Sequence, residues 1–309
     1  MLVVALAALV AYLRRDVTAV FYRVRGQYAG SRALEEWTQG ADRCRLVELR
    51  NHNGETVTTA YVRTPQPLPP YPRVLLSYAG EKTGKVMLEL IPHRDDLVLV
   101  AVQYPYERPR KSDAYLRWPG DLRHAVFRTV AGGMLALSFL AEEGISTDRV
   151  TALGVSLGSP FGVMHGALDP RVDTVVVVHG GGGLTSVVYG IERRGGHAWR
   201  APLTAGLAAA LVGAFDPLRY AGRIAPRRLT IIASRHDRYF PTSSAQALYD
   251  HARQPKSLRW TDTEHVGARK QAIVADLVRL IERELDESAP PSVPPALLNA
   301  SPAPRPAPD

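Results

Sequence analysis

The chain has 309 residues, of which 46% are hydrophobic, so it can form one large α/β domain with a sizeable core or two smaller domains. The formal net charge is +8, but the arginines are scattered and no basic patch is interleaved with aromatic residues, which argues against a nucleic-acid partner. The single cysteine, Cys44, excludes an internal disulfide and a metal site built from several cysteines; it falls in a predicted strand, where a buried, inert thiol is expected.

The N-terminal segment, residues 1–40, starts with a run that is almost wholly apolar over residues 1–13 and is followed by Arg14 and Arg15. That run is too short to cross a bilayer unaided, which takes about 20 residues, and it lacks the basic start of a secretory signal. A membrane anchor, an atypical signal peptide and an ordinary N-terminal helix are the three interpretations, of which we favour a membrane-associated helix. Because the arginines follow the apolar run, an anchor would leave the folded domain on the cytoplasmic side; export is the alternative.

The folded domain is predicted over residues 41–287, where apolar strand-like runs and helical patterns follow one another along the chain. Strands are expected at 43–49, 56–63, 73–77, 97–102, 150–153, 172–178, 229–233 and 258–261. Helices are expected at 86–91, 120–143, 160–165, 184–193, 203–214, 242–252 and 268–285. Residues 288–309 are dominated by Pro, Ala and Ser and cannot bury enough apolar surface to fold, so they are predicted to be a disordered tail.

The loop after the strand at 73–77 contains Gly80–Lys85, which superficially looks like a phosphate-binding loop. Such a loop has four residues between its glycines and a hydroxyl residue after its lysine. Here three residues intervene and Val86 follows the lysine, so nucleotide binding is not expected. A glycine-bearing loop after an early strand can instead supply a backbone N–H to an oxyanion, and Gly80 or Glu81 is the candidate donor.

The segment Gly154–Gly158 reads Gly-x-Ser-x-Gly between an apolar run and a predicted helix. This strand–turn–helix context is that of a nucleophile elbow. A serine on so tight a turn needs unusual backbone angles, and neighbours without a Cβ keep the turn from colliding with the strand and helix beside it. Ser156 is therefore the candidate nucleophile, and the N–H of Leu157 is the candidate first donor to an oxyanion.

The strand at 172–178 ends in His179 and four glycines. A similar His-Gly run forms the oxyanion motif of some lipases, but there it precedes the nucleophile, so we interpret this one as a flexible exit from a strand beside the pocket. Residues 184–215 then contain two short helical patterns, which we interpret as a small cap over the site; an ordinary crossover helix with a long loop is the alternative. In a cap, Tyr189, Trp199 and the leucines of this segment would line the substrate pocket.

A serine alone is a weak nucleophile and needs a base. His265 closely follows the last predicted strand, and of the nine histidines it alone lies downstream of the other candidates and at a strand end. Asp237 lies just past the preceding strand and can fix the imidazole tautomer. The alternatives are a turn carboxylate at Asp237 and a surface histidine at His265. The order Ser, Asp, His, each after a different strand, favours a catalytic triad with Ser156.

On these residues the chain resembles the α/β-hydrolase superfamily, from about Arg43 to Leu285. The elbow carries most of the match, and Phe215-Asp216-Pro217 with Ile224-Ala225-Pro226 resembles the run that leads to the acid in many members. The resemblance implies an α/β-hydrolase fold: a mostly parallel central sheet flanked by helices, with a small helical cap insertion at 184–215. Three motifs depart from the common pattern: Ser234-Arg235-His236-Asp237 replaces Gly-x-x-Asp, Glu264-His265 replaces Gly-His, and Ala79-Gly80 replaces His-Gly.

The resemblance implies a serine hydrolase that acts on a small-molecule carboxylic ester or thioester through an acyl-enzyme on Ser156. The chemistry requires no metal and no cofactor. Acyl transfer to an alcohol and peptidase activity could use the same three residues. The alternative from another class is a membrane-tethered binding protein that keeps the fold without the chemistry.

Overall fold

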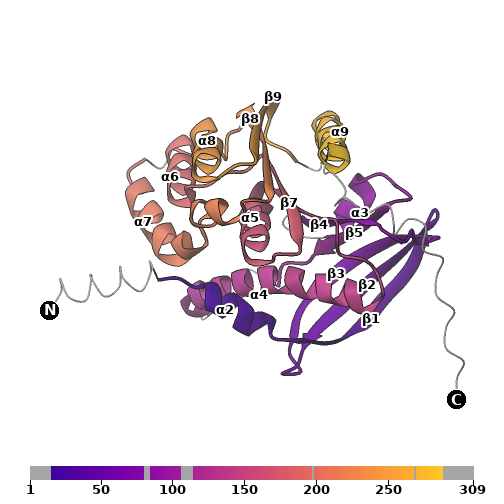
Figure 1. The fold of residues 1–309 in the computed structure, drawn as a ribbon. Helices are drawn as coiled ribbons and strands as arrows, with labels where there is room; N and C mark the ends of the chain where they lie inside the picture. Colours follow the sequence, from indigo (N-terminus) through magenta and orange to yellow (C-terminus); the bar gives the residue numbers. More distant parts are fainter. Residues whose placement is uncertain (1–14, 80–83, 106–113, 197, 268, 288–309) are drawn as a thin grey trace, which may run out of the picture.

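The computed structural model describes residues 15–79, 84–105, 114–196, 198–267 and 269–287. Within them a nine-stranded sheet has the order β1-β2-β3-β5-β4-β6-β7-β8-β9 (Figure 1). The strands are β1 (Tyr28–Gln39), β2 (Asp42–Asn51), β3 (Thr56–Pro65), β4 (Arg73–Tyr78), β5 (Leu97–Val102), β6 (Val150–Val155), β7 (Val172–Val178), β8 (Arg228–His236) and β9 (Lys256–Glu264). The first three strands and the β3–β5 pair are antiparallel, and every pair from β5 through β9 is parallel, so the mostly parallel sheet that was predicted is confirmed.

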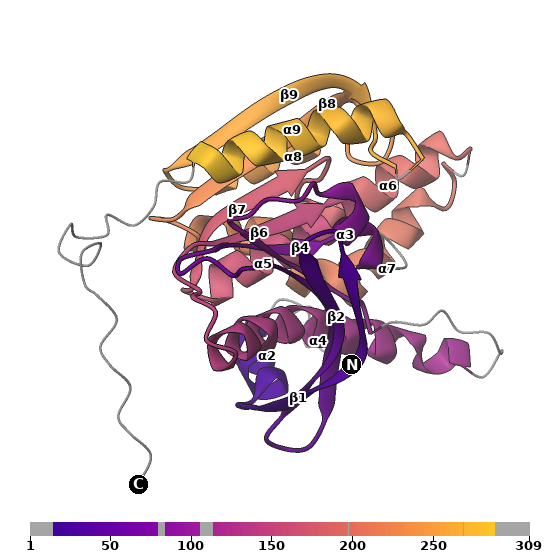
Figure 2. The same ribbon diagram turned by 90° about the vertical axis from the view of Figure 1, so that its right-hand side faces the viewer.

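Helices cover both faces of this sheet, as Figure 2 shows for α9 on one side and α4 with α2 on the other. The helices are α2 (Thr18–Arg25), α3 (Lys85–Leu90), α4 (Ala114–Glu142), α5 (Ser159–Leu168), α6 (Leu184–Arg194), α7 (Ala201–Val212), α8 (Thr242–His251) and α9 (Gln271–Glu287). Four single-turn 3₁₀ helices lie between them: η1 (Ser156–Gly158), η2 (Gly213–Phe215), η3 (Pro217–Arg219) and η4 (Ala221–Arg223).

The core consists of two layers because neighbouring residues of a strand face opposite sides of the sheet. On β5, Val98 and Val100 pack toward the layer that holds α2, α4, α5 and α8, whereas Leu97 and Leu99 pack toward α3 and α9. Burial on both faces explains why the central strands read as continuous apolar runs. Cys44 is buried on β2, and burial raises the pKa of its thiol above the ordinary value, in keeping with an inert side chain.

The residues between 15 and 40 are part of this packed structure, although the sequence suggested a domain start at residue 41. Strand β1 pairs with β2 along its whole length, and Phe21 of α2 is fully buried with its ring 4.8 Å from that of Phe127 on α4. The hydroxyl of Tyr22 donates to the backbone oxygen of Leu168 at 2.7 Å. The apolar run at 1–13 and the tail at 288–309 lie outside the described residues.

One described helical segment, Gly120–Glu142 of α4, is long and apolar enough to span a bilayer by length and composition. However, 78% of its most apolar window is buried inside the protein, where it packs against the sheet, α2 and α5. Its apolar character is therefore explained by its place in the core.

The predicted cap region forms a helical hairpin, in which α6 and α7 lie side by side at one end of the molecule (Figure 1). Helix α6 begins shortly after the carboxyl end of β7. The carboxylate of Asp216, just before η3, accepts the backbone N–H groups of Gly183 at 2.9 Å and Leu184 at 2.7 Å, which ties the start of α6 to the chain that follows α7. The hairpin therefore extends from the same edge of the sheet at which β6, β8 and β9 end.

Candidate active site

The three residues predicted as a triad follow three different strands of the parallel part of the sheet. Ser156 follows β6, Asp237 follows β8, and His265 follows β9. Because these strands run in the same direction, their carboxyl ends meet at one edge, which is where ligands bind in open α/β sheets. The fold thus brings together residues that are up to 109 positions apart along the chain.

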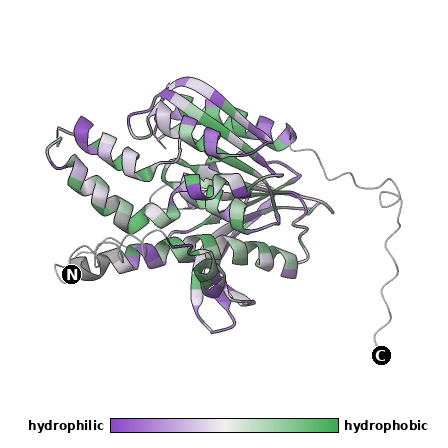
Figure 3. Ribbon diagram, turned by 60° about the vertical axis from the view of Figure 1, so that its left-hand side comes forward, coloured by the Kyte–Doolittle hydropathy of each residue, from purple (hydrophilic) through white to green (hydrophobic). Residues whose placement is uncertain are grey.

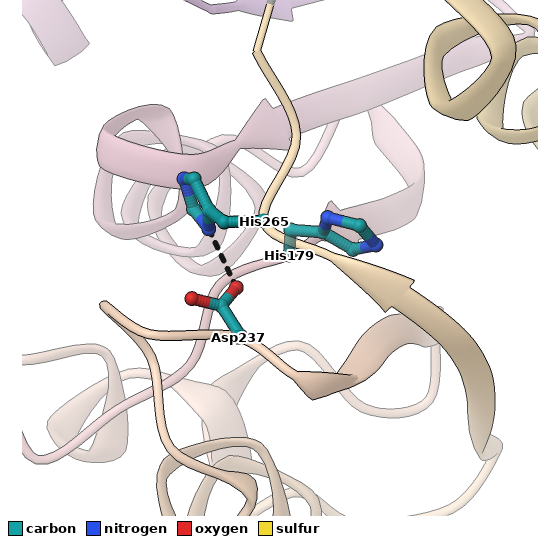
Figure 4. Close-up of side chains that lie close together, drawn as sticks. All are labelled: His179, Asp237 and His265. Atoms are coloured by element: carbon teal, nitrogen blue, oxygen red, sulfur yellow. Dashed lines mark hydrogen bonds and ion pairs between the residues drawn. The ribbon is translucent and has the colours of Figure 1, made fainter. Parts of the chain in front are cut away.

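Ser156, His265 and Asp237 form one chain of hydrogen bonds. The Oγ of Ser156 lies 2.7 Å from Nε2 of His265, and the Nδ1 of His265 lies 2.5 Å from Oδ2 of Asp237 (Figure 4 draws the second contact). An ionised carboxylate can only accept, so Nδ1–H of His265 donates to Asp237. In the neutral imidazole with this tautomer, Nε2 accepts the hydroxyl hydrogen of Ser156. This is the arrangement that lets an imidazole take a proton from a serine.

The carboxylate of Asp237 is held in its ionised form. Its side chain is only 1% exposed, and burial alone would raise its pKa. The hydrogen bond from His265 and those from the backbone N–H groups of Phe240 and Tyr239 outweigh burial and keep the pKa below its ordinary value. The rings of Tyr239 and Phe240 also flank the imidazole of His265, with centroid distances of 4.9 and 6.2 Å. His265 is accordingly 8% exposed and held on several sides.

The elbow has the backbone geometry that its sequence pattern predicts. Ser156 has a φ of 54°, a left-handed backbone conformation that costs free energy in a residue with a side chain. The tight turn holds Ser156 in this conformation. A Cβ on Gly158 would lie 1.9 Å from the backbone oxygen of Tyr78, and one on Gly154 would lie 2.8 Å from the backbone oxygen of Gly158. Both positions need glycine because backbone, which cannot move away, occupies the space. The glycines therefore let β4, the elbow and α5 approach one another closely.

His179 is a buried residue at this edge whose contacts the sequence pattern does not reveal. It is 1% exposed and, with Ser156, is one of two non-glycine residues with positive φ in the described chain. Its Nδ1 accepts the backbone N–H of Val266 at 2.9 Å, and its Nε2 lies 3.3 Å from the hydroxyl of Thr261. Burial outweighs the opposing charge of Asp237 and lowers the pKa of His179 to about 4, so the ring is neutral at pH 7.

The glycines after His179 are closely packed, whereas the sequence suggested a flexible exit. A Cβ on Gly180 would lie 1.7 Å from Oγ of Ser159, and one on Gly181 would lie 2.4 Å from Oγ of Ser244. The signal that could have identified this segment is the position of a histidine directly at the end of β7, the strand next to the elbow strand β6.

His179, Asp237 and His265 have potential metal-ligand atoms within 4.8 Å of one another (Figure 4). The ring nitrogens of both histidines already have protein partners. Those of His265 contact Ser156 and Asp237, and those of His179 contact Val266 and Thr261. Hydrogen bonding within the protein therefore accounts for this cluster.

The candidate oxyanion donors are placed only in part. Leu157 lies in η1, immediately after Ser156, with its side chain 53% exposed and its backbone at the start of the turn that leads into α5. Gly80 and Glu81 lie outside the described residues, so the second donor is not placed.

Comparisons with known proteins agree with this fold. The acetyl xylan esterase 1 of Thermoanaerobacterium sp. JW/SL YS485 is similar with a TM-score of 0.62 at 15% identity, over 87% of this chain and 94% of that one. An acetyl xylan esterase from Paenibacillus sp. R4 has a TM-score of 0.62 at 16% identity, over 89% and 93%. A puromycin-hydrolyzing peptidase of Mycobacterium tuberculosis has a TM-score of 0.58 at 18% identity, over 82% and 40%.

The chain therefore has the α/β-hydrolase fold, as the resemblance at its elbow implied. Residues 202–301 also match a family described as PhoPQ-activated pathogenicity-related protein. No curated protein matches the sequence.

Proposed function

We propose that this protein is a serine hydrolase that cleaves a carboxylic ester or thioester of a small molecule through an acyl-enzyme on Ser156. The observation that carries the proposal is the continuous hydrogen-bonded chain from Ser156 through His265 to Asp237, with contacts of 2.7 and 2.5 Å. The likeness of the fold to two acetyl xylan esterases supports an ester as the substrate class.

In the acylation step, Oγ of Ser156 forms a bond to the acyl carbon while its proton passes to Nε2 of His265. The carbonyl π electrons move onto oxygen. The carboxylate of Asp237 stabilises the imidazolium that forms. When the tetrahedral species collapses, the bond to the alcohol or thiol breaks, and Nε2 returns the proton to that leaving group.

The negative oxygen of the tetrahedral species needs hydrogen-bond donors that are already in place. We assign the first to the backbone N–H of Leu157, because it follows the nucleophile at the start of a helical turn, where N–H groups have no partner within the helix. Gly80 or Glu81 is proposed as the second donor.

In the deacylation step, His265 takes a proton from water, and the water oxygen attacks the acyl-enzyme. The acid leaves, and Ser156 regains its proton from Nε2. The same three side chains and the same oxyanion donors serve both half-reactions.

A fluorophosphonate probe tests the proposal, because it labels a serine only when a base activates it. We expect labelling of the full chain and none in Ser156→Ala. Ser243→Ala, at an exposed serine of α8, is the matched control and should label like the parent. Hydrolysis of p-nitrophenyl esters of increasing acyl length should be lost only in Ser156→Ala, by about 10⁶ in kcat. Unchanged labelling of Ser156→Ala would exclude this serine as the nucleophile.

Peptidase activity is the second candidate, favoured by the fold's likeness to the puromycin-hydrolyzing peptidase. Parallel assays of p-nitrophenyl esters and p-nitroanilides that carry the same acyl group separate the two activities. Acyl transfer would appear as product partition toward an added alcohol. A chain that neither labels nor turns over any of these substrates would be a binding protein.

We also propose that residues 1–13 associate the protein with a membrane, with the hydrolase domain on the cytoplasmic side. The apolar run followed by Arg14 and Arg15 supports this proposal. Export is the alternative, and fractionation of cells that produce the full chain distinguishes the two.

A further inference from the structure

The α6–α7 hairpin carries a concentration of exposed apolar side chains. Eleven large hydrophobic residues are exposed in the described chain, and five of them lie between residues 189 and 207. Tyr189 and Ile191 are two positions apart on α6 and lie on different sides of that helix, so we define the hairpin surface by the other three: Trp199, Leu203 and Leu207. Trp199 is 82% exposed and Leu203 is 75% exposed, the two highest values among the eleven. Clustered exposure of this kind marks an interaction site more often than chance.

Helix α7 buries two of its alanines and leaves two of its leucines exposed. Ala201 and Ala205 are buried, at 0% and 6% exposure, whereas Leu203 and Leu207, four residues apart and so on one side of the helix, are exposed. A helix that only filled space in the fold would bury its leucines. Figure 3 shows α7 coloured mostly toward the hydrophobic end of the scale. The outward leucines are therefore not explained by the packing of this domain.

The sequence around the hairpin surface carries a net positive charge. Between residues 189 and 207 it contains three arginines and one acidic residue, Glu192, which pairs with Arg200 at 2.7 Å and so leaves Arg193 and Arg194 as the excess charge. Arg193 and Arg194 are exposed, and the guanidinium of Arg193 lies 5.8 Å from the ring centre of Tyr189. A second copy of the chain would bring these arginines together and be repelled. The phosphates of lipid headgroups have the complementary charge.

The described chain begins in contact with the segment that follows this hairpin. The backbone oxygen of Arg15 accepts from Nη2 of Arg219, and the hydroxyl of Thr18 accepts from Nη1 of Arg223 at 3.0 Å. Both arginines lie shortly after the end of α7. In Figure 1 the start of α2 and the helix α7 lie toward the same side of the molecule. The described chain thus begins, at residue 15, on the side of the molecule that carries α7.

We propose that the α6–α7 hairpin docks on the surface of an anionic lipid bilayer. Trp199, Leu203 and Leu207 enter the headgroup region, where the amphipathic ring of tryptophan is favoured. Arg193 and Arg194 bind lipid phosphates. The contact is made by the folded domain itself and adds to any contact made by residues 1–13, so that two separate elements orient the protein on the membrane.

Co-sedimentation of the full chain with lipid vesicles tests the proposal. The vesicles contain phosphatidylcholine alone or phosphatidylcholine with phosphatidylglycerol. We expect stronger binding to the second kind, and a loss of at least about fivefold in the partition coefficient for Leu203→Ser/Leu207→Ser. Arg193→Gln/Arg194→Gln should remove most of the preference for phosphatidylglycerol. The matched control, Leu34→Ser/Leu68→Ser, changes two exposed leucines elsewhere and should bind like the parent.

A local readout separates the hairpin from the N-terminal run. The fluorescence of Trp199, obtained as the difference between the parent and Trp199→Phe, should shift to the blue on vesicle binding and be quenched by brominated lipids. An unchanged Trp199 signal, or equal vesicle binding by the leucine variant and its control, would overturn the proposal. A dimer that dissociates in the leucine variant, seen by analytical ultracentrifugation, would assign the surface to a second copy and also overturn it.

The proposal stands apart from the hydrolase function. All of these substitutions are at exposed positions, so thermal unfolding and fluorophosphonate labelling of Ser156 should match the parent protein in every variant. If the parent protein is not labelled by the fluorophosphonate, only the proposed hydrolase function is contradicted. If the vesicle-binding experiments do not give the expected results, only the proposed docking surface is contradicted.

Discussion

Nδ1 of His179 accepts the backbone N–H of Val266 at 2.9 Å, so the end of β7 is bonded to the residue that directly follows His265. The two residues are 87 positions apart. His179 holds an unusual backbone conformation and gives up hydration to make this contact, and its ring centre lies 6.0 Å from that of His265. The contact ties down the loop that carries the imidazole of His265, and we predict from it a positioning role for His179.

Substitution of His179 tests this positioning role with a matched pair. Asn and Gly both tolerate the φ of 47°, but only Asn retains an acceptor near the place of Nδ1. We expect His179→Gly to lower kcat by about 10- to 100-fold with little change in KM, because a shift of about 1 Å at the base suffices for that loss. His179→Asn should retain most of kcat. Equal kcat losses in the two variants would show that the acceptor plays no part.

The buried His179 also predicts a pH dependence of stability. Its pKa is about 4 in the folded protein and 6.5 in an unhindered chain, so between these values the unfolded state binds a proton that the folded state does not. Stability is therefore lost as pH falls from about 6.5 toward 4, by up to about 3 kcal/mol. His179→Asn lacks this titration. Urea unfolding of the parent and of His179→Asn at pH 7.0, 5.5 and 4.5 should show that the difference between their free energies of unfolding decreases as the pH falls. The same difference at all three pH values would contradict the lowered pKa of His179.

Neutralising Asp237 should cost activity without unfolding the protein. In Asp237→Asn the side chain can no longer stabilise the imidazolium or enforce the Nδ1–H tautomer, so we expect kcat to fall by about 10⁴ with the Ser156 hydroxyl unchanged in place. Asp262→Asn is the matched control: its carboxylate is 78% exposed and pairs with Arg235 at 3.0 Å, away from the imidazole. Steady-state kinetics of both variants on one p-nitrophenyl ester test this prediction. Similar kcat values for the two variants would show that Asp237 is not part of the proposed triad.

Adding one methyl group at the elbow should be enough to disturb it. In Gly158→Ala the new Cβ would lie 1.9 Å from the backbone oxygen of Tyr78, so β4 and the elbow must separate. We expect a stability loss of about 2 kcal/mol or more, together with weaker fluorophosphonate labelling. Gly213→Ala is the control, because a Cβ there meets nothing within 4 Å and its φ is −61°. Thermal unfolding compares the two, and a parent-like Gly158→Ala would contradict the steric account.

Much of the fold was predictable from local patterns. The strands from β4 to β8 are buried on both faces, so their sequences are short apolar runs that need no partner to be recognised. Strand β1 is different: its residues are mostly exposed and polar, and only its pairing with β2 makes it a strand. The placement of α2 likewise depends on a pocket for Phe21 that α4 and η2 form together. Such elements are specified by their neighbours and carry a weak signal of their own.

The sequence by itself determined that Ser156, Asp237 and His265 lie at one edge of the sheet, because each follows an apolar run and parallel strands end at a common edge. It also predicted the tight turn at Ser156, because a Gly-x-Ser-x-Gly pattern between a strand and a helix is typical of a nucleophile elbow. Tertiary structure alone decided the role of His179, the need for the glycines beside it and the outward face of α7. Each of these depends on which distant backbone atom or open solvent meets the side chain, and no local pattern contains that information.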